Sequence, residues 1–144
     1  MLVASGRVRV AHKFDRRLVT EDRKKPLVLY KFQKLNVYKL ALSYIKAVYA
    51  LSQKLPDKER FNLTSQIERA AISIALNIAE GSTGQSNAEQ KRFLSFALRS
   101  YLETIACLDL SEELGYITQV ETSKLREQGH QLFIKLLAFR KSLG

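Results

Sequence analysis

The chain has 144 residues, no tryptophan, two prolines, six glycines and a formal net charge of +10. This length suits one domain with its own core, and so few prolines and glycines favour long helices over many short strands. The longest apolar runs are too short for a bilayer span of about 20 residues, and the basic N-terminus lacks the apolar stretch of a signal peptide. Since the single cysteine excludes an internal disulfide, we expect a soluble cytoplasmic protein without a membrane partner.

Positive charge is concentrated near the N-terminus. Residues 1–34 hold ten bases and three acids, whereas residues 35–144 hold fourteen bases and eleven acids. Residues 1–31 show no sustained helical period, and Pro26 breaks any helix there, so we expect an irregular basic arm. Such an arm favours a polyanionic partner such as nucleic acid, with a solubilising leader as the alternative. The candidate contacts in the arm are Arg7, Arg9, Lys13, Arg16, Arg17, Arg23, Lys24 and Lys25.

The first long helix is predicted over about residues 35–54, before Pro56 ends it. Apolar residues recur at alternating three- and four-residue steps and predict one buried face. These residues are Tyr38, Ala41, Ile45 and Val48. A second set widens the apolar face and suggests more than one neighbour; it comprises Leu42, Tyr44, Tyr49 and Leu51.

The second helix is predicted from about residue 61 to Gly81. Asn62 or Thr64 is expected to cap its first turn, and Gly81 is expected to adopt the left-handed conformation that follows a helix. The predicted core stripe is Leu63, Ile67, Ala70, Ala71, Ile74 and Ile78. The following link, residues 81–85, favours a plain turn, although its glycines and hydroxyls also suit a phosphate.

A second, more polar stripe runs along the same helix. Its members are Gln66, Ala70, Ser73, Asn77 and Glu80, at four- and three-residue steps that place them on one line. One interpretation is a polar margin that forms hydrogen bonds to another helix. The other is a contact between subunits or a ligand groove.

The third helix is predicted from a capping box at Ser86 and Glu89 to about Leu114. Its expected core line is Phe93, Ala97, Tyr101, Ile105 and Leu108. Its bases are candidate nucleic-acid contacts, namely Lys91, Arg92 and Arg99.

The fourth helix follows a second capping box, at Thr118 and Glu121. Its expected core seam is Leu125, Gly129, Leu132, Leu136, Phe139 and Leu143. Gly129 within this seam predicts the close approach of another helix. Arg140 and Lys141 near its end complement the helix dipole and are further candidate nucleic-acid contacts.

Four long amphipathic helices with short links predict antiparallel neighbours. The expected fold class is therefore all-α: an antiparallel up-down-up-down four-helix bundle over residues 32–144, preceded by the irregular basic arm.

The sequence contains no constellation typical of catalysis. One Glu-x-x-His pair, Glu127 and His130, has the spacing of a di-iron motif, but it faces away from the predicted seam and has no second copy. Cys107 between apolar neighbours is predicted to be a small core residue. We therefore expect no enzyme, metal, cofactor or small-molecule substrate.

The second predicted helix resembles the central signature of a bacterial four-helix-bundle family, first met as proteins encoded within intervening sequences of 23S rRNA genes. The runs Leu63 to Ile74 and Asn77 to Gly81 carry the resemblance. Further matches are Leu35 to Ala41, Arg92 to Leu94, Ser100 with Glu103, and Leu114 to Ile117. The sequence departs from the pattern at Glu68, where a second arginine is common, and at Ala75, where proline often interrupts the helix.

The resemblance implies a bundle that assembles as a ring, typically a homopentamer. It also implies kinship with accessory proteins of diversity-generating retroelements, similar bundles that bind nucleic acid and a partner reverse transcriptase. The resemblance supplies no catalytic residues, and the arm lies outside it.

Charge and resemblance lead to two hypotheses. The first is a non-enzymatic, oligomeric bundle that binds nucleic acid, RNA foremost, with a reverse transcriptase as a candidate partner. A ring would multiply weak phosphate contacts through multivalency. The alternative is a protein-interaction scaffold that assembles through apolar helix faces.

Overall fold

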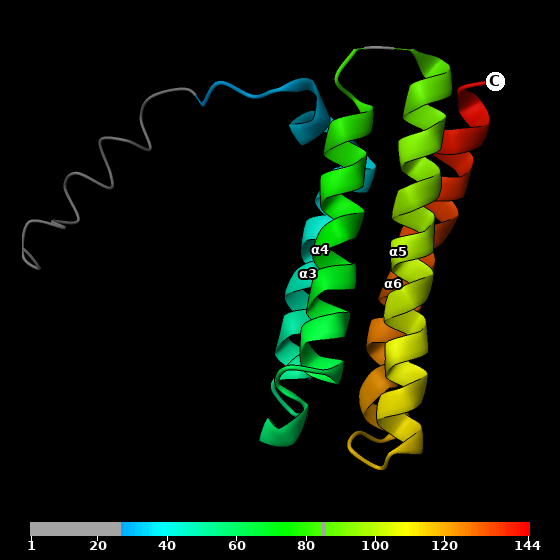
Figure 1. The fold of residues 1–144 in the computed structure, drawn as a ribbon. Coiled ribbons are helices and arrows are strands. Elements are labelled where there is room, and N and C mark those ends of the chain that lie inside the picture. The colour runs from blue at the N-terminus through cyan, green and yellow to red at the C-terminus, as the bar shows by residue number, and fades with distance from the viewer. Residues whose placement is uncertain (1–26, 85) are drawn as a thin grey trace, which may run out of the picture.

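The chain folds as an all-α, up-down-up-down bundle, which confirms the predicted fold class. The computed structural model describes residues 27–84 and 86–144. Its elements are the 3-10 helix η1 (Lys31–Lys34), α3 (Asn36–Ser52), the 3-10 helix η2 (Asp57–Glu59), α4 (Leu63–Gly81), α5 (Asn87–Glu113) and α6 (Gln119–Ser142). Each long helix packs against its neighbour in the chain, and α6 closes the bundle against α3 (Figure 1). Among the helices that the structure describes, none combines the length and the hydropathy that a membrane span requires.

The helix starts confirm one predicted cap and correct two others. The capping box of Thr118 and Glu121 forms in full, and a hydrogen bond from the Thr118 backbone lowers the pKa of Glu121. At the start of α5, Ser86 caps the Glu89 amide at 3.1 Å, but the Glu89 carboxylate turns to Arg92 instead of returning to Ser86. Asn62 occupies the position before α4, but its side chain makes no capping hydrogen bond and instead donates to Glu59 at 3.1 Å.

Gly81 has a different role from the one predicted. It is the last residue of α4 and is buried, whereas Gly84, with φ of +87°, takes the left-handed conformation in the turn. A Cβ at Gly81 would lie 2.9 Å from the Cβ of Phe93. The glycine is therefore required by the close packing of α4 against α5 and not by the geometry of a helix end.

The predicted core stripes are largely confirmed, with shifts on α5 and α3. On α5, Ala97, Tyr101 and Leu108 are buried as predicted, but Phe93 and Ile105 are only half-buried, and Leu94 and Leu98 are buried. All six residues expected in the stripe of α4 are buried, and so are Leu125, Gly129, Leu132 and Leu136 of α6. On α3, however, Tyr44 is fully buried, whereas Tyr38 and Ile45 are half-buried. The face of α3 that enters the core is thus centred on Ala41, Tyr44 and Val48, because α6 and α4 approach it from both sides.

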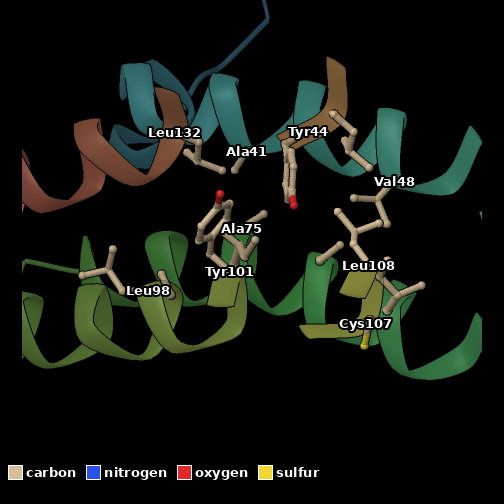
Figure 2. Packing of buried hydrophobic residues seen from close by; sticks show 14 of the residues in the cluster. Ala41, Tyr44, Val48, Ala75, Leu98, Tyr101, Cys107, Leu108 and Leu132 are labelled. Atoms are coloured by element: carbon tan, nitrogen blue, oxygen red, sulfur yellow. The ribbon is translucent and has the colours of Figure 1, made fainter. Parts of the chain in front are cut away.

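Two tyrosines meet at the centre of the bundle (Figure 2). Tyr44 comes from α3 and Tyr101 from α5, with ring centroids 5.6 Å apart. The Thr104 hydroxyl donates to the Tyr101 carbonyl at 2.6 Å, so its single proton is used. The Tyr44 hydroxyl must therefore donate to Thr104 Oγ1, at 2.7 Å, which satisfies a polar group that is otherwise surrounded by apolar side chains.

Gly129 of α6 makes room for both rings. A Cβ there would lie 2.7 Å from Tyr44 Cε1 and 2.8 Å from Tyr101 Cε1, distances that real side chains do not tolerate. The close approach predicted from the glycine in the α6 seam is thus confirmed, and the approaching groups are aromatic rings from two different helices.

Replacing Gly129 by alanine is expected to destabilise the bundle. Alanine is more favourable in a helix than glycine by about 1 kcal/mol. Its methyl group would, however, overlap the rings of Tyr44 and Tyr101, and such overpacking costs about 1–3 kcal/mol. Urea unfolding should show a net loss, while Gln131→Ala, at an exposed position of the same helix, should stay near wild type. A Gly129→Ala variant as stable as wild type would contradict this packing.

The stability of the bundle is expected to fall in alkali through Tyr44. Burial raises the pKa of its phenol above the ordinary value of 10.0. Because the unfolded chain releases this proton first, the contribution is complete below about pH 10 and is lost as the pH rises toward the folded pKa. The free energy of unfolding, measured at about pH 8 and about pH 11, should fall less at the higher pH for Tyr44→Phe than for wild type. An equal loss in both would contradict the assignment.

Candidate nucleic-acid interface

Eight of the predicted contacts, those at positions 7, 9, 13, 16, 17 and 23–25, lie outside the described residues. The described chain begins at Leu27, and Lys31 and Lys34 of η1 are exposed where it meets the bundle. Lys31 lines a small hollow with Gly81, Gly84 and Ser86. The start of the described chain, with Lys31 of η1, therefore lies beside the turn between α4 and α5 (Figure 1).

Three predicted contacts from two helices gather at this same end. Lys91 near the start of α5 lines one hollow together with Arg140 and Lys141 near the end of α6. The Lys91 ammonium donates to the Gly144 carbonyl oxygen, and the Arg140 guanidinium donates to the Ser95 hydroxyl at 3.2 Å. The Ser95 hydroxyl is uncharged, so the positive charge of Arg140 stays available to an anion.

Arg92 and Arg99 lie on a different face of α5 from Lys91. Arg92 pairs with Glu89 at 2.5 Å and lies over the ring of Phe96, with its guanidinium carbon 5.4 Å from the centroid. Arg99 lies over the same ring at 5.7 Å. Phe96 was absent from the predicted sites, although its spacing of four and three residues from the two arginines places all three on one helix line.

Charge is distributed unequally between the two ends of the bundle. One half contains the start of α3 and α5 and the end of α4 and α6, and is called here the basic half. It holds nine bases and two acids. It comprises residues 27–44, 72–84, 86–100 and 131–144. The other half, called the acidic half, holds seven bases and nine acids and comprises residues 45–71 and 101–130. Antiparallel packing thus gathers the excess of bases in the described residues at one end of the bundle.

One cation of the acidic half, Arg126, is neutralised by two carboxylates. The Arg126 guanidinium lies 2.8 Å from Asp109 and 2.6 Å from Glu112. Partial burial disfavours its charge, but the hydrogen bond that Arg126 donates to Asp109 and the charge of Glu112 prevail and raise the pKa of Arg126. Thr122 donates to the other oxygen of Glu112 at 2.5 Å, which fixes that carboxylate. This cluster ties α5 to α6 and offers little free positive charge to a polyanion.

The polar stripe of α4 contacts α5 at two of its members. Gln66 donates to Glu103 at 3.2 Å, and Ser73 accepts a hydrogen bond from Ser100 at 2.8 Å. Asn77 donates within its own helix, to the Ser73 carbonyl at 2.8 Å. Glu80 is exposed, and it lines a shallow groove on the outer face of α4 together with Ser73 and Asn77.

The remaining chemical candidates are isolated from one another. Glu127 and His130 are both exposed on α6, with His130 against the Phe133 ring. Within residues 27–84 and 86–144, no three His, Cys, Asp or Glu side chains gather as metal ligands would. Cys107 is buried in the core, as predicted, and burial raises the pKa of its thiol.

Residues 33–138 match the family described as "23S rRNA-intervening sequence protein". The chain belongs to this family. The match confirms the resemblance carried by α4, and it includes Lys91, Arg92 and Arg99 of the basic half. Arg140, Lys141 and the N-terminal arm lie outside the matched range.

A solved structure from the same kind of bundle supports the family assignment. It is the crystal structure of a protein of unknown function from the S23 ribosomal protein family of Bacteroides thetaiotaomicron VPI-5482. The two chains share 26% identity with a TM-score of 0.67, over 73% of this chain and 98% of the other. No curated protein matches the chain.

Proposed function

We propose that this member of the 23S rRNA-intervening sequence protein family is a non-enzymatic protein that binds nucleic acid, RNA foremost, at the basic half of its bundle. The observation that carries the proposal is the segregation of charge between the two ends. Lys91, Arg140 and Lys141 converge from separate helices. Lys31, which follows the arm in the sequence, lies at the same end, beside the turn between α4 and α5. Phosphates would displace counterions from this end, so binding is strongest at low salt.

Removing charge from the basic half should weaken RNA binding. The triple variant Lys91→Gln, Arg140→Gln, Lys141→Gln is expected to bind an RNA of about 20 nucleotides roughly tenfold or more weakly at low salt, with the slope of log K against log salt reduced by about two. Fluorescence anisotropy over a salt series measures both quantities.

The matched control removes the same charge from the acidic half. Lys46→Gln, Lys58→Gln and Lys124→Gln change exposed lysines there and should leave the salt slope within about half a unit of wild type. Equal losses in the two triple variants would show that only net charge matters and would refute a localised interface.

We further propose that the protein acts as a homo-oligomer. Apolar side chains are exposed on the outer surface of α4, where Leu76 is 60% exposed and Ile72 37%. They border the groove that Ser73, Asn77 and Glu80 also line. A second copy of the chain would cover this surface together with Asn77 and Glu80 of the polar stripe, while multiplying the number of basic ends on one assembly.

Placing a charge in this surface should reduce the assembly. Leu76→Glu is expected to give a smaller species than wild type in size-exclusion chromatography with light scattering. Burying an unpaired carboxylate in an apolar contact costs on the order of several kcal/mol, which would weaken the contact between copies. Val120→Glu, at an 84% exposed position at the start of α6, should leave the mass unchanged. A monomeric wild type, or a Leu76→Glu variant of wild-type mass, would refute this part of the proposal.

A further inference from the structure

Two phenylalanines of α5 lie apart from the hydrophobic core. Phe93 and Phe96 are half-buried, and their ring centroids are 5.8 Å apart in an edge-to-face arrangement. In the described part of the chain, Phe133 and Phe139 of α6 pack against the buried core, whereas neither Phe93 nor Phe96 belongs to that set. Their rings therefore contribute little to the hydrophobic core and lie at the surface of the bundle.

Arginines surround these rings. Arg92 lies over both, with its guanidinium carbon 5.2 Å from the Phe93 centroid and 5.4 Å from the Phe96 centroid. Arg99 lies over Phe96 at 5.7 Å. All three distances are within the range of cation–π attraction, and the Arg92–Glu89 ion pair holds one guanidinium in place. Arg92, Phe96 and Arg99 thus form a strip along the outer face of α5, about 10 Å long at 1.5 Å per residue.

The chemistry of this strip suits an unpaired nucleobase. Guanidinium planes and aromatic rings both stack on the flat face of a base, and an arginine within a stack also reaches a neighbouring phosphate. Bases inside a duplex are stacked on each other and present only edges, so a duplex cannot use such a surface. The strip begins one residue after Lys91, so a strand whose phosphates contact the basic half would bring its bases within reach.

We propose that the Arg92–Phe96–Arg99 strip binds unpaired bases of single-stranded RNA or DNA. The proposal rests on the proposed nucleic-acid function and adds a selectivity to it. The lysines and arginines of the basic half contact phosphates of any strand, and the strip adds affinity only where bases are free to stack. The protein therefore prefers single strands over duplexes of the same length.

The test compares an oligouridine of about 20 nucleotides with an RNA duplex of about 20 base pairs at one low salt concentration. Phe96→Leu keeps an apolar side chain and a good helix former but removes the aromatic face. It should weaken binding to the single strand by roughly five- to 100-fold and leave duplex binding within about twofold. The double variant Arg92→Lys, Arg99→Lys keeps both charges but loses the planar groups, and it should show the same selective loss.

Phe61→Leu is the matched control. Phe61 is 90% exposed and has Arg60 over its ring at 5.4 Å, but it lies in the acidic half. This variant should bind both probes as wild type does. If Phe96→Leu binds the single strand as tightly as wild type, or loses both probes equally, the strip is not a base-stacking site although the proposed function stands. A wild-type protein that binds neither probe would overturn both proposals.

Discussion

The packing of Tyr44 and Tyr101 against Gly129 is the constraint on which the rest of the bundle depends. It involves three of the four helices, since α3 and α5 supply the rings and α6 supplies the space. The hydrogen bond from Tyr44 to Thr104 fixes the position of α3 along the axis of α5, because the two hydroxyl oxygens must stay within hydrogen-bond distance. A side chain at position 129 would push α6 away, and a shift along any of the axes would leave a buried hydroxyl without a partner.

The relative positions of the helices along the bundle axis determine where charged residues gather. Because the four helices alternate in direction, the first half of one lies beside the second half of the next. Charges that are far apart in the sequence, such as Lys91 and Lys141, therefore share one end, while the acids of α5 and α6 other than Glu89 lie in the other half. The interaction of Arg126 with Asp109 and Glu112 stabilises the acidic end internally. The basic end has no comparable network in the described residues, and this difference underlies the proposed interface.

Periodicity predicted the four helices and most of the core because apolar side chains at three- and four-residue steps must share a face. It misplaced the centre of α3, since both Tyr44 and Tyr38 fit an apolar face and only the positions of α4 and α6 decide between them. The caps at Asn62 and Glu89 were wrong because each side chain found a partner, Glu59 and Arg92 respectively, that a local motif does not consider. Gly81 was predicted to adopt the left-handed conformation that follows a helix, but it ends α4 in helical geometry, and its role depends on Phe93 of another helix.

The candidate interface was predictable only in part. The bases of α5 and α6 were named, but their separation into two groups follows from the direction in which each side chain leaves its helix. The segregation of charge could have been found by counting charges per half-helix once an antiparallel bundle was expected. Phe93, by contrast, was placed in the core because it is apolar and correctly spaced. Its pairing with Arg92 and Phe96 required the structure.

The central claim is that the polarity of the bundle directs nucleic acid to one end. Hydroxyl-radical footprinting of the assembled protein with and without single-stranded RNA tests it most directly, because exposed apolar side chains report at both ends. The account predicts protection of Phe93, Phe96 and Leu137 in the basic half, with Leu110, Leu114 and Val120 in the acidic half oxidised as before. Protection confined to the acidic half, or spread equally over both, would contradict it.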